Sequence, residues 1–223
     1  MPDASRPIAI VDYGVGNLFS VRQACTAVGL QAIVTSDAND LRRSSCIVLP
    51  GIGAFGDAMA ALEDLHLVDC LRHASSEGIP LVGICLGMQL LMERSTEFGS
   101  FEGLALVPGS VERLTPARRE VKVPQVGWNS IYRAGAGPRR ADPWAASALR
   151  GTTDGEPMYF VHSYVVKPTS SHVVLARSTY GGEEFCSALT AGNVTGFQFH
   201  PERSGPAGLR VYQNLATMLT ESR

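Results

Sequence analysis

Short apolar runs alternate with amphipathic segments along the first 100 residues of this 223-residue chain. Four of the runs have the length and composition of buried strands, and they cover residues 7–11, 31–35, 46–49 and 79–84. The segments between them carry apolar residues three or four positions apart, which is the period of a helix. Strands joined through helices make right-handed crossovers, so the pattern predicts a mainly parallel sheet covered on both faces.

Three helices are predicted in this part of the chain. The first has its apolar face between Leu18 and Val28 and ends at Gly29, because glycine tolerates the left-handed conformation that closes many helices. The second carries apolar residues over 55–65, and the third follows the last of the four strands over residues 88–93.

After residue 100 the pattern changes to β-prone segments with only turn residues between them. They cover residues 109–114, 121–128, 158–166 and 172–178 and suit antiparallel strands. A last apolar strand is predicted over 194–199, and a terminal helix over 206–222. The complete prediction is an α/β fold with a flavodoxin-like, mainly parallel sheet flanked by helices and additional antiparallel strands in the second half.

The segment 133–150 differs from its surroundings because it is rich in Ala, Gly, Pro and Arg. Asp142 and Pro143 have the residue types of a helix cap and a first helical position, and Gly151 is a stop signal. We therefore expect a surface loop that leads into a short helix.

The charge balance argues against several classes of partner. The chain has 19 basic and 21 acidic residues and no basic block that would suit nucleic acid or an anionic membrane. No apolar stretch approaches the roughly 20 residues that span a bilayer, and residues 1–5 lack the features of a signal peptide. We expect a soluble, cytoplasmic protein that forms one domain over residues 1–223.

The five cysteines form no recognisable scaffold. They are Cys25, Cys46, Cys70, Cys85 and Cys186. The set is odd in number and contains no C-x-x-C pair and no histidine at zinc spacing. We therefore expect no disulfide framework, no metal site and no cofactor.

The pentapeptide Gly83-Ile84-Cys85-Leu86-Gly87 links the fourth strand to the helix that follows. A buried strand that runs into a helix must turn sharply, and flanking glycines let neighbouring backbone come close to the turning residue. Cys85 then projects from the bend, where the free N–H groups of the helix start favour a thiolate nucleophile. The alternative is a glycine-rich turn whose cysteine is a small buried hydrophobe.

The last strand delivers His200 and Glu202, separated by Pro201. The carboxyl ends of parallel strands are where α/β sheets bind ligands. Proline keeps its predecessor extended, and extended residues two apart can point the same way, so Glu202 can orient the His200 imidazole. Together with Cys85 this predicts a nucleophile, a general base and acid, and an orienting carboxylate. Without the cysteine, His-Pro-Glu would be an ordinary strand exit.

A thiolate that attacks an acyl carbon creates an oxyanion, which needs N–H donors in place beforehand. The backbone amide of Leu86 is one candidate donor. Flexible backbone follows the third strand at Gly51, Ile52 and Gly53. In a flavodoxin-like order this strand lies beside the strand over 79–84 that leads into the turn, or elbow, at Cys85. The alternative for residues 51–53 is a plain glycine turn.

The cysteine elbow, the glycine turn and the His-Pro-Glu triplet together resemble the class I, or triad, glutamine amidotransferases, and the resemblance covers nearly the whole chain. Within that family the chain is similar to the glutaminase subunits of imidazole glycerol phosphate synthases. The segments that carry this closer resemblance are 12–18 (DYGVGNL), 50–55 (PGIGAF), 83–91 (GICLGMQLL), 127–129 (GWN), 159–164 (YFVHSY) and 196–204 (GFQFHPERS).

The resemblance implies hydrolysis of glutamine to glutamate and ammonia through a cysteine thioester. Cys85 would be the nucleophile, His200 the base and acid, and Glu202 the orienting group, in agreement with the reading of the residues themselves. The ammonia would serve a synthase that makes imidazole glycerol phosphate and an aminoimidazole carboxamide ribotide in histidine biosynthesis.

The resemblance also implies a pocket for L-glutamine. Gln89 and Glu97 match pocket residues of the family, and the acid would pair with the α-ammonium group of the substrate. Backbone near His162, Ser163 and Tyr164 would hold the α-carboxylate. The alternatives are solvent-facing helix polarity for Gln89 and Glu97, and a hydrogen-bonded structural role for His162.

Members of this family dock onto a (β/α)8-barrel cyclase subunit that receives the ammonia, so the resemblance implies a heterodimer. Asn17, Trp128, Tyr159 and Arg203 match positions near that interface, and many members carry lysine where Arg203 stands. Core packing is the alternative for Trp128 and Tyr159. We expect low glutaminase activity in the isolated chain, because this avoids futile hydrolysis.

Three other functions stay open at this stage. The chain is alternatively the glutaminase subunit of another amidotransferase, such as pyridoxal 5'-phosphate synthase, or a non-enzymatic subunit that senses glutamine or holds a partner. The segment 14–17 (GVGN) is alternatively a phosphate loop, but it lacks the third glycine of the dinucleotide fingerprint.

Overall fold

The computed structural model describes residues 6–118, 120–135 and 142–221. One half of its main sheet is built from β1 (Ile8–Val11), β2 (Ala32–Thr35), β3 (Cys46–Gly51), β4 (Leu81–Cys85) and β13 (Val194–Phe197). These strands lie in the order β2-β1-β3-β4-β13, and all neighbours among them pair in parallel. The predicted α/β class and flavodoxin-like order are confirmed.

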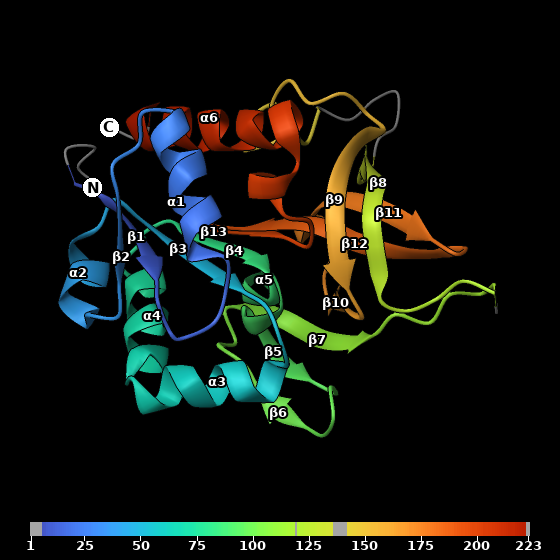
Figure 1. Ribbon diagram of the computed structural model, residues 1–223, viewed down its shortest axis with the longest axis horizontal. Coiled ribbons are helices and arrows are strands. Elements are labelled where there is room, and N and C mark those ends of the chain that lie inside the picture. Colours follow the sequence, from blue (N-terminus) through green and yellow to red (C-terminus); the bar gives the residue numbers. More distant parts are fainter. Residues whose placement is uncertain (1–5, 119, 136–141, 222–223) are drawn as a thin grey trace.

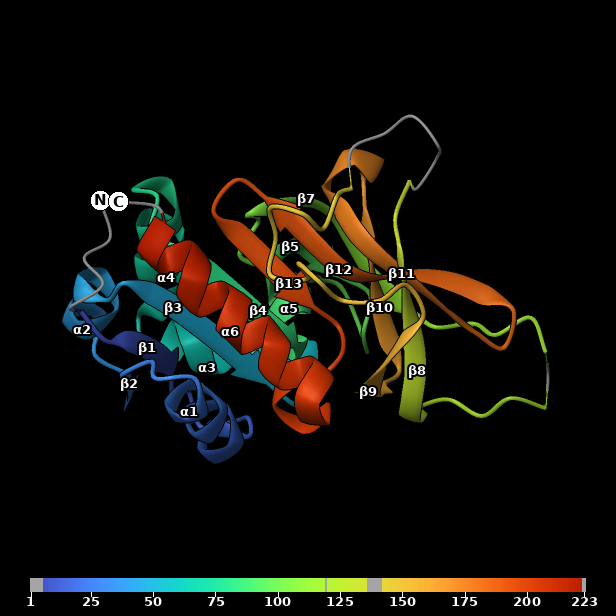
Figure 2. The ribbon, with the colours of Figure 1, turned by 90° about the horizontal axis from the view of Figure 1, so that it is seen from above.

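Helices cover both faces of this parallel half (Figures 1 and 2). Two of them, α1 (Leu18–Ala27) and α6 (Gly205–Glu221), lie on one face. The opposite face carries α2 (Ala38–Arg43), α3 (Phe55–Asp64) and α4 (Leu67–Ser76). None of the helices within the described ranges is long and apolar enough to cross a membrane.

The strands divide their side chains between two apolar cores. In β1, Ile8 and Ile10 join the core under α1 and α6, whereas Ala9 and Val11 join the core under α3 and α4. This alternation is the period of two that a strand imposes. Buried residues on both faces explain why the strands read as continuous apolar runs in the sequence.

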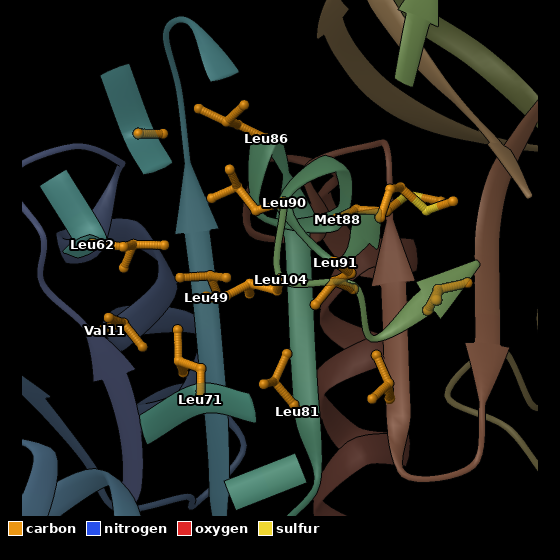
Figure 3. Close-up of a cluster of buried hydrophobic side chains, with 14 of the residues drawn as sticks. Val11, Leu49, Leu62, Leu71, Leu81, Leu86, Met88, Leu90, Leu91 and Leu104 are labelled. Atoms are coloured by element: carbon orange, nitrogen blue, oxygen red, sulfur yellow. The ribbon is translucent and has the colours of Figure 1, made fainter. Parts of the chain in front are cut away.

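Figure 3 shows the core under α3 and α4, where side chains from strands and helices meet. Val11, Leu49 and Leu81 come from three neighbouring strands and approach Leu62 of α3 and Leu71 of α4. All five side chains are fully buried. Burial of each stabilises the fold by about 2 kcal/mol, so this core holds the strand ends in a fixed relation.

Between the short helix α5 (Leu86–Leu90) and β13 the described part of the chain forms eight further strands. They are β5 (Met92–Ser95), β6 (Phe101–Glu102), β7 (Val107–Arg113), β8 (Gln125–Arg133), β9 (Glu156–His162), β10 (Tyr164–Pro168), β11 (Val174–Tyr180) and β12 (Glu183–Ala191), with a short 3₁₀ turn η1 (Ser171–Val173) before β11. The order β13-β12-β11-β8-β9 extends the main sheet antiparallel, and β10-β7-β5-β6 make a second sheet. The predicted antiparallel pairing of the second half is confirmed for β7 with β10 and for β8, β9 and β11, and β7 also pairs in parallel with β5.

The predicted helix over residues 88–93 is wrong in its position. In the structure α5 begins immediately after Cys85 and ends at Leu90, and Met92 already belongs to β5. Residues 86–92 are buried throughout. An apolar run that is buried on all sides carries no periodic signal, so its pattern cannot separate helix from strand.

The predicted single strand over 158–166 is also wrong, because the chain changes sheets at Ser163. The part before it, β9, pairs with β8 in the main sheet, whereas β10 pairs with β7 in the second sheet. The strand expected over 121–128 begins later, at Gln125, and continues to Arg133. The elements α2, α4, β5, β6 and β12 had no counterpart in the sequence prediction.

The short helix predicted after Asp142 and Pro143 does not form. Asp142 does act as a cap, since its Oδ1 accepts a hydrogen bond from Trp144 N at 2.9 Å, but residues 143–150 form successive turns. Residues 136–141 of the predicted surface loop lie outside the described residues. The segment is held by Trp144, which is fully buried and donates from Nε1 to the Leu175 carbonyl at 2.7 Å.

Trp144→Ala should lower the free energy of unfolding by about 3–5 kcal/mol, because it removes a fully buried indole. Trp144→Phe keeps the apolar ring and loses only the hydrogen bond, so we expect a loss of about 1–2 kcal/mol. Trp128 is 59% exposed, and Trp128→Ala is the matched control, with an expected change below about 0.5 kcal/mol. Urea unfolding measures all three. Equal losses for the two alanine variants would contradict an anchoring role for Trp144.

Candidate active site

Cys85 lies at the junction of β4 and α5 in a rare backbone conformation, with φ 55° and ψ −109°. Such a conformation costs a non-glycine residue roughly 1–3 kcal/mol and persists only where the surrounding packing holds it. The helix starts at the next residue, so the thiol sits at its positive end. The residue is 5% exposed, and its sulfur faces a cavity.

The backbone around this turn is packed too closely for a side chain at the flanking glycines. A Cβ on Gly87 would lie 1.7 Å from the Leu49 carbonyl oxygen, and one on Gly83 would lie 2.6 Å from the Gly87 carbonyl oxygen. On β13, a Cβ on Gly196 would lie 2.6 Å from the Met88 side chain. The prediction that these glycines allow close backbone approach is confirmed for Gly83 and Gly87.

His200 and Glu202 lie beyond the end of β13, where the 3₁₀ turn η2 (Pro201–Arg203) reverses the chain. Nδ1 of His200 and Oε1 of Glu202 are 2.8 Å apart, and both side chains are almost completely buried. The last strand ends at Phe197 rather than at residue 199. A tight turn, not an extended strand, therefore brings the carboxylate to the imidazole.

The second ring nitrogen of His200, Nε2, is buried and has no hydrogen-bond partner among the described residues. Burial opposes protonation of the ring, but the charge of Cys85 and the hydrogen bond and charge of Glu202 outweigh it and raise the pKa of His200 to about 10. The imidazole is therefore cationic at neutral pH and oriented by Glu202. Nε2 is left to exchange a proton in the site.

A cavity of about 230 Å³ opens in front of Cys85, a size that suits a small molecule. Its walls come from the segment after β3, the elbow, α5 and the junction of β9 and β10. The lining residues are Ile52, Gly53, Cys85, Leu86, Gln89, Glu97, Pro124, Val161, His162, Ser163 and Tyr164. Of the residues predicted for catalysis, the oxyanion site and the glutamine pocket, His200, Glu202 and Gly51 are not part of this lining, and none of the four predicted interface residues is.

The glycine turn after β3 lies directly beside the elbow, because Gly51 is in register with Cys85 across β3 and β4. A Cβ on Gly51 would lie 2.4 Å from the Tyr13 hydroxyl oxygen, so packing alone requires glycine here. The Tyr13 hydroxyl donates to the Pro50 carbonyl at 2.8 Å and orients the peptide that enters the turn. Leu86 begins α5, so its N–H has no acceptor within the helix. The oxyanion role of these amides stays a prediction.

Gln89 and Glu97 are both buried, so solvent-facing polarity is wrong for both. Gln89 Nε2 donates to the Tyr164 carbonyl at 3.0 Å. Glu97 follows β5 rather than a helix, and its Oε2 accepts from Phe55 N at 2.7 Å, the first residue of α3. Burial raises the pKa of Glu97, and that hydrogen bond partly opposes the rise. One carboxylate oxygen thus caps α3.

His162 is a neutral ring whose tautomer the structure determines. Nδ1 lies 3.0 Å from the Tyr164 carbonyl oxygen, which can only accept, so Nδ1 carries the proton. Burial lowers the pKa of His162 to about 4 despite this hydrogen bond. Nε2 is buried without a partner among the described residues. The alternative of a hydrogen-bonded structural role for His162 therefore accounts for Nδ1 but not for Nε2. That the backbone near His162, Ser163 and Tyr164 binds the substrate carboxylate stays a prediction.

Three residues, here called the aromatic row, meet at the Tyr159 ring, which also neighbours His200: Trp128, Tyr159 and Arg203. The Arg203 guanidinium is 4.4 Å from the Tyr159 ring centre, and the Tyr159 ring centre is 6.1 Å from that of Trp128 and 6.5 Å from that of His200. Trp128 is 59% exposed, so core packing is wrong for this residue. Tyr159 is half-buried.

Asn17, the fourth residue predicted near a partner, has a local structural contact. Its Oδ1 accepts from Ser20 N at 3.3 Å and caps α1. The side chain thereby occupies the N-terminus of α1, which a phosphate loop would leave to its ligand. The phosphate-loop alternative is not favoured.

The sequence did not predict two residues that contact the site, Gln198 and Ser204. Gln198 is fully buried and contacts both Gln89 and Cys85. A polar residue between two phenylalanines, two positions before His200, is a signal that could have identified it. Ser204 accepts from Tyr159 N at 3.0 Å and donates to the His200 carbonyl at 2.7 Å, and nothing in the sequence indicates this bridge.

Comparison with known proteins points to one family. The model of the family described as glutamine amidotransferase class-I matches residues 9–218. The chain is 43% identical over 214 residues to the imidazole glycerol phosphate synthase subunit HisH of Moorella thermoacetica, with 96% of each chain covered. It is 44% identical over 208 residues to the HisH subunit of Aquifex aeolicus, with 92% of this chain and 93% of that one covered.

Solved structures support the fold at greater evolutionary distance. A crystal structure of a glutamine amidotransferase superposes with a TM-score of 0.69 at 20% sequence identity and covers 94% of this chain and 98% of its own. The structure of PurLQS from Thermotoga maritima gives a TM-score of 0.69 at 18% identity and covers 98% of this chain. At such identities the likeness concerns the fold alone.

The two buried histidines should titrate at opposite ends of the pH range. NMR signals of the imidazole C–H groups should show His200 losing its proton near pH 10 and His162 staying neutral down to about pH 4. Cys85→Ala removes an attraction that raises the pKa of His200, so its midpoint should fall, whereas Cys70→Ala should leave it in place. An unchanged His200 midpoint in Cys85→Ala would show that the thiol does not act on the ring.

The same shift has a consequence for stability. Because the pKa of His200 is raised above its ordinary value of 6.5, its contribution to the free energy of unfolding is complete below pH 6.5 and disappears as pH rises toward 10. Denaturation midpoints of the wild type and of His200→Gln should therefore converge between these two pH values. A constant difference across that window would be the contrary result.

Proposed function

The chain belongs to the class I glutamine amidotransferases, and we propose that it is the glutamine-hydrolysing subunit of an imidazole glycerol phosphate synthase, supplying ammonia in histidine biosynthesis. Identity above 40% over nearly the full length of HisH subunits supports this assignment over another amidotransferase such as pyridoxal 5'-phosphate synthase. The observation that carries the chemistry is Cys85 on a strained elbow beside the hydrogen-bonded pair His200 and Glu202. A subunit that only sensed glutamine would need none of these three groups.

In the first half of the proposed reaction the Cys85 sulfur attacks the side-chain amide carbon of glutamine. The C–S bond forms, and the carbonyl oxygen becomes an oxyanion that faces backbone N–H groups near Leu86 and the turn at 51–53. His200, held by Glu202, gives its proton to the amide nitrogen. The C–N bond then breaks, ammonia leaves, and a thioester remains on Cys85.

In the second half, water attacks the thioester carbon while the neutral His200 accepts its proton. A second oxyanion forms at the same backbone groups and collapses with cleavage of the C–S bond. Glutamate leaves, and the proton on His200 restores the starting state with Cys85 as thiolate. The net reaction consumes glutamine and water and produces glutamate and ammonia.

The rest of the substrate fits the cavity in one orientation. Glu97 provides negative charge for the α-ammonium group at the cavity wall. The junction of β9 and β10 offers the backbone of Ser163 and Tyr164 to the α-carboxylate. Gln89 lines the wall between them and is fixed by two hydrogen bonds. These polar groups would select an α-amino acid of glutamine length.

The ammonia acceptor in this proposal is a (β/α)8-barrel cyclase subunit that forms a heterodimer with the chain. The aromatic row supports docking next to the active site, because exposed tryptophan and arginine are typical of interface centres and Tyr159 of the row neighbours His200. A partner seated there would cover the site and keep the ammonia from solvent. Asn17 belongs to the same proposed interface.

Two further statements belong to the same proposal. Residues 1–223 would form one glutamine amidotransferase domain, which the family match over 9–218 supports. The protein would work in the cytoplasm, as its charge balance and sequence composition favour. No metal or cofactor enters the proposed steps.

Cys85→Ala should reduce glutamine-dependent synthesis by the complex about 1,000-fold or more, because no other group can form the thioester. Synthesis from an ammonium salt should persist, since the cyclase subunit then receives ammonia directly. Cys70→Ala, at a buried cysteine of α4, is the control and should keep the wild-type rate. Glutamate release and product formation by the reconstituted complex are the measurements. Full glutamine-dependent activity in Cys85→Ala would refute the mechanism.

Trp128→Ala and Arg203→Glu should each weaken binding to the cyclase subunit about tenfold or more, because truncation of central aromatic and arginine contacts has effects of this size. The control is Leu65→Ala, which removes an exposed apolar side chain beyond the end of α3. Isothermal titration calorimetry compares the dissociation constants, and glutamate release is measured with and without the cyclase subunit. Wild-type affinity in both row variants would place the interface elsewhere.

A further inference from the structure

We propose that Gln198 is a further catalytic residue: its side-chain amide donates a hydrogen bond to the Cys85 sulfur and connects that sulfur to the glutamine pocket through Gln89. The proposal rests on the proposed function, since it concerns the same nucleophile. It adds a direct contact to the reacting atom from a side chain that belongs neither to the triad nor to the cavity wall.

The position of Gln198 is closely determined by its neighbours. Gln198 is fully buried immediately after β13, and its backbone N–H donates to the Ser187 carbonyl of β12 at 3.0 Å. The residues on either side, Phe197 and Phe199, are fully buried in the apolar core under α1 and α6. A buried amide in such surroundings is stable only when its polar atoms have partners.

The orientation of the amide follows from a chain of hydrogen bonds that starts at a backbone carbonyl. The Tyr164 oxygen can only accept, so the atom of Gln89 that lies 3.0 Å from it must be the amide nitrogen. The same nitrogen lies 3.2 Å from the Gln198 side chain, which must present its oxygen there. The nitrogen of Gln198 therefore points the other way, and it lies 3.8 Å from the Cys85 sulfur.

The opposite orientation of Gln198 would bring two NH₂ groups face to face. Both would be buried, and each would lose an acceptor, which is costly in the protein interior. The Tyr164 carbonyl thus determines, through two side-chain amides, that a donor and not an acceptor faces the sulfur. The same carbonyl also accepts from Nδ1 of His162 at 3.0 Å.

A donor at this place matters because the sulfur also has an acceptor beside it. The Val161 carbonyl oxygen is 3.6 Å from the Cys85 sulfur, where it accepts the thiol S–H and favours the protonated form. The N–H of Gln198 favours the thiolate instead, and it does so in a buried site where hydrogen bonds to ions are strong. Without Gln198 only the His200 charge and the start of α5 would oppose the Val161 carbonyl, and less of the reactive thiolate would be available.

The test measures the reactivity of Cys85 without requiring glutamine turnover. The purified full-length chain is treated with iodoacetamide, and peptide mass mapping follows alkylation at Cys85 separately from the other four cysteines. Gln198→Leu should slow alkylation at pH 7 about tenfold, while the rate at pH 10 should stay within about twofold of wild type. Gln198→Glu retains the shape of the side chain but lacks the N–H donor, so it should slow the pH 7 reaction at least as much.

A matched control is present in the same molecule. Gln125 is also a buried glutamine, but neither its amide nitrogen nor its oxygen has a hydrogen-bond partner within the described residues. Gln125→Leu should therefore leave alkylation of Cys85 at the wild-type rate at both pH values. Gln89→Leu removes the anchor that orients Gln198, and we expect a slowdown of about two- to fivefold at pH 7.

The outcomes separate this proposal from the proposed function. Slower alkylation confined to pH 7 in Gln198→Leu and Gln198→Glu, together with a roughly tenfold lower kcat for glutamate release by the complex, supports a donor at the sulfur. Wild-type alkylation rates in both Gln198 variants would overturn it, and so would an equal slowdown at pH 7 and pH 10, which would indicate altered access. If the complex released no glutamate, the proposed function would fail while the alkylation comparison still decided the role of Gln198.

Discussion

The approach of the Gly87 backbone to the Leu49 carbonyl is the contact on which the rest of the site depends. A single Cβ at this position would collide with β3, so α5 can lie against the sheet only because residue 87 has no side chain. That placement forces Cys85 into a positive φ and directs its sulfur toward the strand ends. The buried leucines around β3 and β4 hold the strain, because the helix cannot move outward without opening the core.

The charge states of two buried histidines, His200 and His162, are determined by only a few neighbouring groups. Glu202 accepts from one ring nitrogen of His200, and Cys85 and Glu202 together raise the pKa of the ring, so it is cationic beside the sulfur. His162, buried a short distance away, is kept neutral by desolvation. The two buried histidines thus differ in charge, because Cys85 and Glu202 raise the pKa of His200, whereas burial outweighs the single hydrogen bond that His162 makes to a backbone carbonyl.

The cavity depends on the break between β9 and β10. Four consecutive residues, 161–164, line it, which an uninterrupted strand could not achieve because its successive side chains point to opposite faces. At Ser163 the chain leaves the main sheet for the second one. The Tyr164 carbonyl is thereby exposed to two donors at once, and it sets the orientation of Gln89 and the tautomer of His162.

Local sequence alone was sufficient for the parallel half of the fold, for the sharp turn at Cys85 and for the pairing of His200 with Glu202. Apolar runs that are buried on both faces, a cysteine between glycines and the His-Pro-Glu triplet are each visible within ten residues, because their causes are local steric and packing rules. The strand order also followed, since short right-handed crossovers leave few alternatives.

The tertiary structure decided what depends on residues far apart in the chain. The split at Ser163, the turns around Trp144 and the short α5 reflect pairing and burial that no local pattern carries. Gln198 shows the reason most clearly, because its role follows from its contacts with Gln89 and Cys85. These residues precede it in the chain by 109 and 113 positions. In the sequence, Gln198 is only a polar residue within an apolar segment. The folded chain determines which atoms surround its side-chain amide, and therefore which way the amide N–H donates.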